Sequence, residues 1–338
     1  MKVLLYFEKQ KSLKQSGIGR ALTHQKKALE LANVDYTLYK DEGFDLAHIN
    51  TLFFDSYKLL KKCKKNKKLA IVHGHSTVED FRYSFRCWRL IAPIFNRMIL
   101  RMYRKADLII TPTNYSKSLI ENYKRVKCPV YAVSNGIKLE DYQYNEEYVN
   151  EFKKFFNFGN KKIVISAGLY FKRKGIFDFF EVARQMPDVE FIWFGHLDKI
   201  LAQGKVLRAI KKRPKNVSMP GYVDIRVLKG AFLSADAFFF PSFEENEGIA
   251  VLEAMASKTP VLVRDIGVFK DWLTDGVNCY KATDVQSFKD KLEFILNNDV
   301  TNVVNNGYMT VEERTLDKVG NKLKEIYINS YNEKKQGN

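Results

Sequence analysis

Short apolar segments alternate with longer segments of mixed polarity along the whole chain, and this alternation limits the fold more than any other feature. The apolar segments of the first half are 3–7, 35–39, 47–50, 69–73, 107–111 and 130–133, and those of the second half are 162–168, 189–194, 216–219, 237–241, 260–264 and 278–280. Apolar strands separated by helices are typical of parallel sheets that helices cover on both faces. Because the pattern occurs twice, the sequence predicts two doubly wound α/β domains.

The length of 338 residues is enough for two domains of ordinary size. A polar stretch over residues 138–160 separates the two sets of apolar segments. We therefore expect an N-terminal domain over 1–150 and a C-terminal domain over 151–315. From about residue 311 to 331 the sequence is charged and predicts one long helix.

Several classes of protein are excluded by simple counts. No apolar run approaches the roughly 18–20 residues that span a bilayer. Residues 1–7 hold a short apolar stretch followed by charge, which predicts a first strand and not a signal peptide. The 4 cysteines form no CxxC pair, so a reduced cytosolic protein fits better than a disulfide framework or a zinc site.

The net charge of +17 is unevenly distributed. Residues 1–150 hold 27 Lys and Arg against 15 Asp and Glu, so most of the basic excess lies in the first half. Such a surface attracts polyanions, which means nucleic acid or anionic lipid.

The segment from Pro241 to Ala256, PSFEENEGIAVLEAMA, directly follows a very apolar strand. Ligands of open α/β sheets bind at the carboxyl ends of strands, and a helix that begins there offers free amides to a phosphate. Glu245 and Glu253 are eight residues apart. If most of that span is helical, they lie about 12 Å apart on nearly one side of the helix. Ionised carboxylates accept strong hydrogen bonds, so the two suit hydroxyls on either side of a diphosphate.

These residues resemble the E-x7-E motif of retaining GT-B glycosyltransferases of the family 4 type. The preceding Pro-Ser and the following EAMA and TPVL sequences match as well. The resemblance implies a GT-B fold, with two Rossmann-like doubly wound domains facing a cleft and a helix over 316–338 that crosses back to the N-terminal domain. It also implies transfer of a sugar with retention of configuration, without a metal or a cofactor, since the UDP-sugar is a substrate.

The same resemblance implies specific contacts with the donor. Glu245 would contact the donor sugar as a catalytic residue, and Glu253 would contact the ribose of the nucleotide. The amides around Asn246, Gly248 and Ile249 would reach the donor sugar and its phosphate.

The segment AGLYFKRKG, residues 167–175, resembles the G-R-x4-K-G segment whose Arg and Lys hold the diphosphate in this family. Lys174 occupies the Lys position and would stabilise the leaving group, but Leu169 stands where the family has Arg. Lys172 or Arg173 would supply the second charge, and Arg173 is assigned to the donor site. Val223, in a loop after a strand, would contact the nucleobase through its backbone, although a plain turn would look the same.

Gly17 and Gly19 follow the first strand and would let the backbone approach a diphosphate. The third glycine of the dinucleotide-binding fingerprint is absent, because Leu22 occupies its place. The resemblance implies that this loop lies beside the donor phosphates across the cleft. An ordinary strand-to-helix turn is the alternative.

His73 and His75 follow the apolar strand 69–73. The family carries a histidine at this strand end, near the donor sugar and the reacting centre. His75 is the better match and is assigned a catalytic role, with His73 as the alternative. No third metal ligand is evident for the H-x-H pair, while His24 and His48 have no comparable sequence context.

A basic amphipathic segment follows these histidines. Its arginines fall within roughly a 120° arc of a helix; they are Arg82, Arg86, Arg89, Arg97, Arg101 and Arg104. Trp88 and other apolar residues lie opposite, and Pro93 predicts two helices in place of one. Together with seven lysines between Lys58 and Lys68, this pattern is typical of a membrane-surface element. The alternative is that the apolar side belongs to the core and the arginines to a solvated face.

Sequences around Gly17, His75 and Glu245 also resemble bacterial glycolipid synthases that extend glycosyl-diacylglycerol. We therefore expect transfer of glucose or galactose from a UDP-sugar to glucosyl-diacylglycerol by a cytoplasmic protein that associates peripherally with an anionic membrane surface. Alternatives are addition of the first sugar to diacylglycerol, synthesis of a polysaccharide or cell-wall polymer, and a sugar-nucleotide epimerase on the same fold. A nucleic-acid partner is not expected, because no readout module is recognisable.

Overall fold

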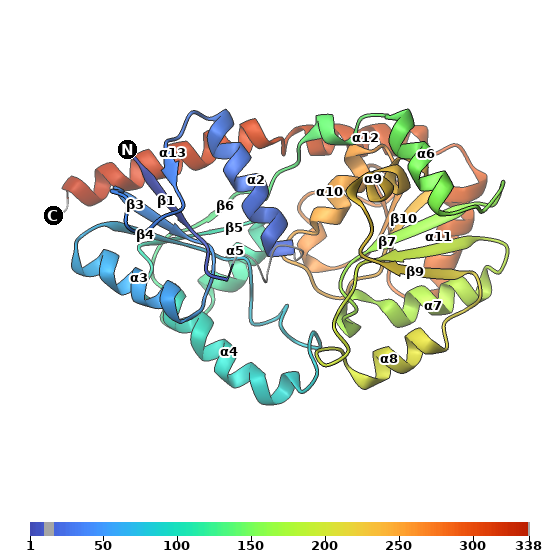
Figure 1. Cartoon of the computed structure of the whole chain (residues 1–338), viewed down its shortest axis with the longest axis horizontal. Helices are drawn as coiled ribbons and strands as arrows, with labels where there is room; N and C mark the ends of the chain where they lie inside the picture. Colours follow the sequence, from blue (N-terminus) through green and yellow to red (C-terminus); the bar gives the residue numbers. More distant parts are fainter. Residues whose placement is uncertain (10–16, 337–338) are drawn as a thin grey trace. The chain divides into compact units, whose positions relative to one another are not determined.

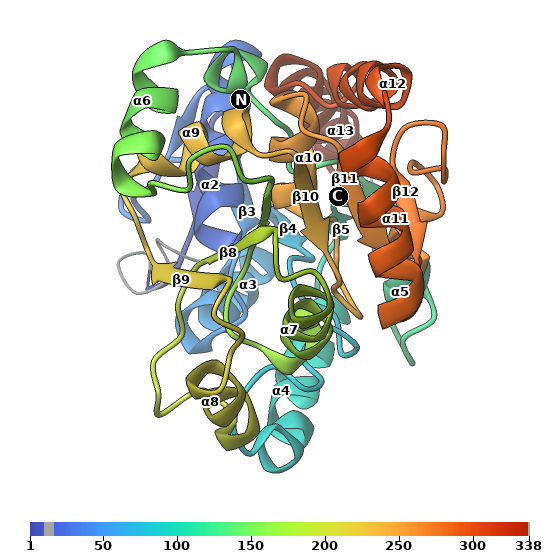
Figure 2. The same cartoon turned by 90° about the vertical axis from the view of Figure 1, so that its right-hand side faces the viewer.

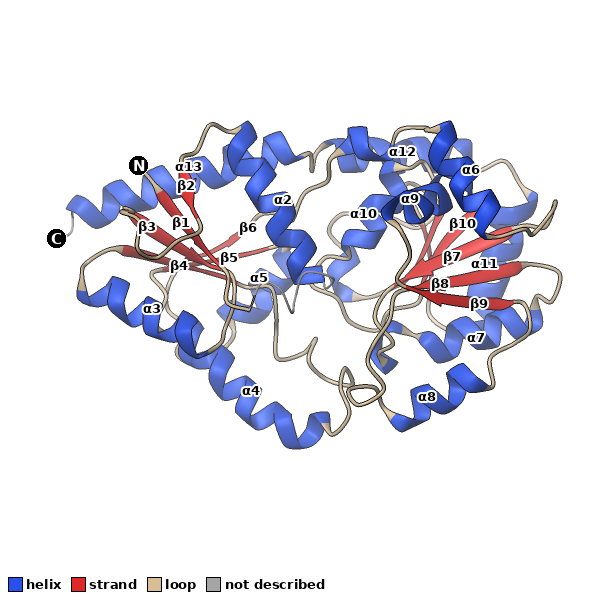
Figure 3. Ribbon diagram, in the orientation of Figure 1, coloured by secondary structure: helices blue, strands red, loops and turns tan. Residues whose placement is uncertain are grey.

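The computed structural model describes residues 1–9 and 17–336, and within them the chain forms two parallel sheets with flanking helices (Figures 1 and 3). The first sheet has the strand order β2-β1-β3-β4-β5-β6. Its strands are β1 (Val3–Tyr6), β2 (Tyr36–Thr37), β3 (Leu46–Ile49), β4 (Leu69–His73), β5 (Leu108–Thr111) and β6 (Val130–Ala132).

The second sheet has the order β12-β11-β10-β7-β8-β9. Its strands are β7 (Ile163–Ala167), β8 (Glu190–Phe194), β9 (Val217–Gly221), β10 (Ala237–Phe240), β11 (Val261–Arg264) and β12 (Tyr280–Ala282). The strand order reverses between β7 and β10, and such a switch point is where doubly wound sheets bind ligands.

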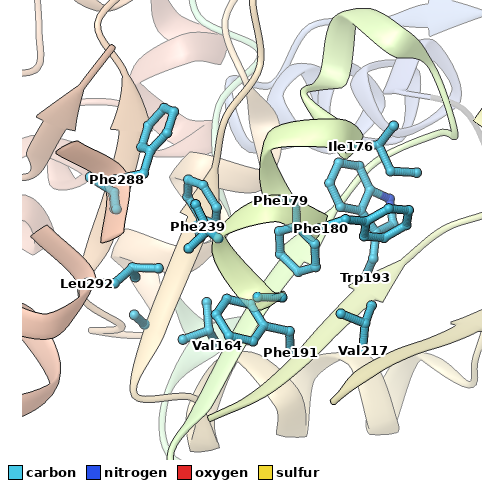
Figure 4. Packing of buried hydrophobic residues seen from close by; sticks show 14 of the residues in the cluster. Val164, Ile176, Phe179, Phe180, Phe191, Trp193, Val217, Phe239, Phe288 and Leu292 are labelled. Atoms are coloured by element: carbon cyan, nitrogen blue, oxygen red, sulfur yellow. The ribbon is translucent and has the colours of Figure 1, made fainter. Parts of the chain in front are cut away.

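Each of the twelve strands overlaps a predicted apolar segment, so the predicted α/β class with two doubly wound sheets is confirmed. The inner strands of each sheet are almost entirely buried, since helices pack on both faces of each sheet (Figure 3). In the second sheet an aromatic core forms on one face, where Phe179 packs against Phe191, Trp193 and Phe239 (Figure 4).

The helices of the first sheet are α2 (Gly17–Leu31), α3 (Phe54–Lys65), α4 (Trp88–Tyr103), α5 (Asn114–Glu121) and α13 (Leu316–Gln336). Those of the second are α6 (Glu146–Phe155), α7 (Ile176–Gln185), α8 (Gly204–Lys211), α9 (Ile225–Ser234), α10 (Ile249–Ala256), α11 (Val285–Asn297) and α12 (Thr301–Glu312). Helices α6 and α9 lie side by side, as Figures 1 and 2 both show. Of the helices that the structure describes, none combines the length and the apolar character needed to cross a bilayer.

The chain divides into two compact units. An N-terminal unit comprises 1–81, 89–136 and the residues from Arg314 onward, while a C-terminal unit comprises 82–88 and 137–313. The main division therefore falls at Gly136, earlier in the chain than residue 150. Seven residues of the first half, Arg82 to Trp88, belong to the C-terminal unit.

The charged segment near the C-terminus forms one long helix, as predicted, but this helix begins at Leu316 and not near residue 311. Helix α12 ends at Glu312, and α13 begins at Leu316. Helix α13 belongs to the N-terminal unit and packs against α2. Its buried residues Leu316, Val319 and Leu323 follow helical spacing and join the core around β1 and β4.

The prediction that Pro93 divides the arginine-rich segment into two helices is wrong. Helix α4 runs unbroken through Pro93, because a proline six residues into a helix removes one hydrogen bond, to the exposed Arg89. The helix begins at Trp88, so Arg82 and Arg86 precede it and do not belong to its basic arc.

Candidate active site

Two loops meet at the switch point of the second sheet. The loop after β7 contains a short 3₁₀ turn, Lys172–Lys174, and the loop after β10 begins at Pro241. The Phe243 amide donates a hydrogen bond to the Arg173 carbonyl at 2.7 Å. Gly175 has a left-handed backbone with φ 78°, and a Cβ there would lie 2.2 Å from the Pro241 carbonyl oxygen. Only glycine therefore allows the two loops to approach this closely.

This approach brings two cations to one carboxylate. The Lys174 ammonium donates a hydrogen bond to Oε1 of Glu245, and Nη1 of Arg173 lies 3.9 Å from Oε2. The three side chains are nearly buried, with exposed fractions of 14% for Lys174, 13% for Arg173 and 8% for Glu245. Burial alone would raise the pKa of Glu245, but Lys174 and Arg173 outweigh it and leave the pKa below its ordinary value.

Arg173 is held by two further acceptors. Its Nε donates to Ser84 Oγ at 2.7 Å, and its Nη1 donates to the Glu244 carbonyl at 2.8 Å. Lys172 is instead exposed, with its ammonium 5.2 Å from the centre of the Tyr83 ring. Leu169 packs against the hydrophobic core of the unit. Of the two candidates for the second charge, the structure thus brings Arg173, and not Lys172, to Glu245.

Helix α10 begins beside this cluster. Gly248 has φ 91°, and the helix starts at Ile249 with no side chain capping it. Because the first amides of a helix have no acceptor within it, those at the start of α10 suit an anion. The span from Glu245 to Glu253 is helical from Ile249 onward, so its first four residues form a loop and not a helical turn. The left-handed backbone of Gly248 is the reason. Asn246 lies half-buried in the preceding loop.

Glu253 is buried on α10, and the Tyr142 hydroxyl donates a hydrogen bond to its Oε1 at 2.8 Å. Tyr142 ends the 3₁₀ turn Leu139–Tyr142, which precedes α6. The sequence reasoning missed Tyr142 because 111 residues separate it from Glu253 and no motif surrounds it. It also missed Ser84, which precedes its partner Arg173 by 89 residues.

Val223 lies in the loop between β9 and α9. The ends of three neighbouring strands are tied together there, since the Gly168 amide bonds to the Phe194 carbonyl and the Gly195 amide to the Gly221 carbonyl, each at 2.9 Å. Val223 is half-buried two residues beyond that last carbonyl. It therefore lies at the carboxyl edge of the sheet, as the predicted nucleobase loop requires.

In the N-terminal unit, three polar side chains surround the buried His48: Gln25, Tyr327 and His73. Gln25 Nε2 lies 2.9 Å from His48 Nδ1, which also lies 2.6 Å from the Tyr327 hydroxyl. His48 Nε2 lies 3.1 Å from His73 Nδ1, so the two rings are joined by one hydrogen bond. His73 Nε2 has no hydrogen-bond partner among the described residues.

His75 stacks on His73 with ring centres 3.8 Å apart, and its Nε2 donates to the Asn50 amide oxygen at 2.8 Å. Burial lowers the pKa of His73 to about 3 and holds the pKa values of His48 and His75 well below the ordinary value. All three rings are therefore neutral near pH 7. His75 is the half-buried outer member of the stack, which suits contact with a substrate, while His73 remains the alternative.

Gly17 and Gly19 lie in the first turn of α2, with Gly17 exposed and Gly19 buried. The loop before them, including Ser16, lies outside the described residues. His24, further along α2, lies 2.8 Å from the Gly136 carbonyl through its Nδ1, so it packs within the N-terminal unit.

The six predicted membrane arginines are exposed: Arg82, Arg86, Arg89, Arg97, Arg101 and Arg104. Ile99 and Met102 on the apolar side of α4 are core residues, as the alternative interpretation requires. The first half of the same helix nevertheless exposes two large aliphatic side chains, Leu90 at 77% and Ile94 at 72%. Trp88 is half-buried at the start of the helix.

Within residues 1–9 and 17–336, no three His, Cys, Asp or Glu side chains are grouped as metal ligands would be.

The fold and the cluster at the switch point define a class, the GT-B glycosyltransferases. Two family models match the chain: "Glycosyltransferase Family 4" over residues 19–141 and "Glycosyl transferases group 1" over residues 149–309. The chain is 51% identical to the processive diacylglycerol alpha-glucosyltransferase of Acholeplasma laidlawii, over 97% of this chain and 98% of that protein. The chain therefore belongs to the glycosyltransferase family that these two models describe, and the predicted enzyme class is confirmed.

More distant relatives agree with this assignment. The alpha-galactosylglucosyldiacylglycerol synthase of Streptococcus pneumoniae is 27% identical over 71% of this chain and 64% of its own length. Among solved structures, Anabaena Alr3699/HepE in complex with UDP-glucose superposes with a TM-score of 0.76 at 14% identity, covering 97% of this chain and all of that one. At that identity the similarity shows the fold alone.

Proposed function

We propose that this protein transfers glucose from UDP-glucose to diacylglycerol, and then to the glucosyl-diacylglycerol that it forms, with retention of configuration. The observation that carries the proposal is the 51% identity, over nearly the whole of both chains, to a processive diacylglycerol alpha-glucosyltransferase. The expected acceptor, glucosyl-diacylglycerol, and the alternative, diacylglycerol, then become successive substrates of one enzyme.

The geometry of the C-terminal unit supports a nucleotide-sugar donor. Lys174, Arg173 and the first amides of α10 form a cationic site at a switch point, which suits a diphosphate. Arg173 already has two fixed acceptors, so its position is established before the donor binds. Glu245 balances both cations and has a carboxylate that accepts hydrogen bonds from sugar hydroxyls.

In the proposed reaction, the bond between the anomeric carbon and the β-phosphate oxygen of the donor breaks. The acceptor hydroxyl oxygen forms its bond to the same carbon on the same face, and the hydroxyl proton passes to the leaving phosphate. Lys174, Arg173 and the α10 amides stabilise the charge that develops on that phosphate. Neutral His75 acts as a hydrogen-bonding group toward the donor sugar. No metal ion or cofactor takes part in this scheme.

We also propose that the acceptor is reached at the surface of an anionic membrane, through α4 and the basic residues around it. Leu90 and Ile94 are exposed between Arg89 and Arg97 on this helix. Exposed aliphatic side chains flanked by arginine are typical of helices that lie in the membrane interface.

The test uses radiolabelled UDP-glucose and UDP-galactose with vesicles that contain diacylglycerol or glucosyl-diacylglycerol. We expect glucose to enter both lipids and to give a series of products with one, two and more sugars. Digestion with an α-glucosidase should release the added glucose. Lipid products only from UDP-galactose would contradict the choice of donor, and no lipid product from either donor would contradict the proposed function.

A further inference from the structure

A segment of the C-terminal unit contacts the seven-residue stretch Arg82 to Trp88. The Arg86 amide donates to the Leu201 carbonyl at 2.8 Å, and the Gln203 side-chain amide donates to the Tyr83 carbonyl at 2.9 Å. These two hydrogen bonds join the stretch to the loop that precedes α8. Both segments and α8 belong to the same unit.

Residues 199–215 contain seven Lys and Arg and no Asp or Glu. The exposed side chains Lys205 and Arg208 of α8 and Lys212, the residue that caps its end, are spaced three and four residues apart, so they share one face. Val206 is buried on the other face, with Leu207 and Ile210 packed against the core. The cationic face of α8 is therefore fixed outward by the packing of its apolar face.

These cations are not neutralised by the protein itself. Lys199, Lys205, Lys211, Lys212 and Lys215 form no ion pair with a carboxylate in the part of the chain that the structure describes. The acidic residue just before them, Asp198, lies 3.8 Å from His196. Unpaired positive charge on a rigid helix is complementary to an anionic surface.

Large apolar side chains are exposed beside this charge. Ile200 is 82% exposed, Leu201 is 45% exposed and Tyr83 is 44% exposed. The Tyr83 ring packs against Trp88 with centres 4.7 Å apart. Aliphatic side chains add little to binding a nucleic-acid backbone, whereas they gain free energy when they enter the boundary between lipid headgroups and acyl chains.

We propose that these residues form a second membrane-docking surface, on the C-terminal unit, that binds anionic phospholipid. This α8 surface consists of Lys205, Arg208, Lys211, Lys212, Ile200, Leu201 and Tyr83. All of these residues belong to the C-terminal unit, whereas α4 from Arg89 onward belongs to the N-terminal unit. The inference rests on the proposed function, because it supplies the donor-binding unit with its own contact to the membrane that contains the acceptor.

The test compares two triple variants for binding to phosphatidylcholine vesicles with and without phosphatidylglycerol. The first is Lys205→Gln/Lys212→Gln/Ile200→Ser. The control, Lys153→Gln/Lys154→Gln/Phe155→Ser on α6, removes the same charge and a similarly exposed apolar side chain from the same unit. We expect the first variant to partition onto phosphatidylglycerol vesicles at least tenfold less, since each removed charge costs roughly fivefold. The control should bind as the unaltered protein does.

Equal vesicle binding by both variants would overturn the inference. So would a variant that binds vesicles normally but loses binding to a single-stranded RNA oligonucleotide, because the surface would then serve nucleic acid. Transfer to diacylglycerol in detergent micelles tells the two proposals apart. The α8 variant should be fully active there. If the unaltered protein transfers nothing in micelles, the proposed function is contradicted, and the vesicle-binding result then tests the α8 surface by itself.

Discussion

The ammonium of Lys174 donates a hydrogen bond to the carboxylate of Glu245, although one follows β7 and the other follows β10. A buried carboxylate with two cations is stabilised by them, and removal of one member leaves uncompensated charge. Under the proposed function, the pair therefore makes donor binding and local stability interdependent.

Glu245→Ala should lower kcat/KM for glucose transfer by about 10²–10³-fold, because the cations lose the group that balances them and the donor sugar loses an acceptor. It should also lower the free energy of unfolding by about 3 kcal/mol. Steady-state kinetics and urea unfolding measure the two effects. Glu181→Gln, on the exposed surface of α7, should change neither. Near-normal turnover by Glu245→Ala would show that Glu245 has no catalytic role.

Arg173→Lys should reduce kcat/KM for UDP-glucose by roughly tenfold or more, because lysine keeps the charge but cannot bond to Ser84 and the Glu244 carbonyl together. Ser84→Ala should produce a smaller loss of the same kind. Leu169→Arg should not restore an Arg173→Ala enzyme, since Leu169 packs on the core. Restoration by Leu169→Arg would show that the charge is not tied to residue 173.

Tyr142→Phe should raise KM for UDP-glucose by about tenfold, because the buried Glu253 carboxylate loses a hydrogen bond that orients it. Tyr148→Phe is the matched control. The Lys229 ammonium lies 5.7 Å from the centre of each of these two rings, but only the Tyr142 hydroxyl bonds to Glu253. An equal change in both variants would assign the effect to Lys229 and not to Glu253.

The free energy of unfolding should fall as pH decreases from 6.5 to 5. Burial lowers the pKa of His48, His73 and His75 in the folded state, so the unfolded chain binds more protons in this range. The loss is at most about 1.4 kcal/mol per pH unit for each histidine. His75→Gln should reduce the slope, because it removes one of the three buried rings. Urea unfolding at each pH measures it, and a flat profile would contradict the burial of these rings.

Leu90→Ser/Ile94→Ser should weaken binding to phosphatidylglycerol vesicles by about tenfold or more, because both side chains are exposed and would bury apolar area in the interface. Neutralising Arg82, Arg86 and Arg89 should act in the same direction. Hydrolysis of soluble UDP-glucose should be unchanged in both. Val277→Ser, at an exposed position of the C-terminal unit, serves as the control. If the variants bind vesicles as the unaltered protein does, the exposed face of α4 is an ordinary solvated surface.

The strands could be predicted because their signals are local. The apolar run 69–73 lies between lysines and a glycine, and Pro241 ends β10 one residue after Phe240. The motif around Glu245 could be recognised for the same reason, and the structure places it directly after β10. Contacts across long sequence separations could not be predicted, since nothing near Tyr142 or Ser84 marks its partner. The exposure of Leu90 and Ile94 was also hidden, because periodicity does not tell how far a helix extends beyond the sheet it covers.

The stretch from Arg82 to Trp88 has a consequence for how such enzymes can be recombined. It brings Ser84 to Arg173 from a point in the chain that lies before β5. A chimera that joins residues 1–136 of one relative to residues 137–313 of another would therefore take the Ser84 hydroxyl from the first protein and the Arg173 guanidinium from the second. Exchange of donor specificity between members of the family should succeed only when residues 82–88 are transferred together with the segment that follows Gly136.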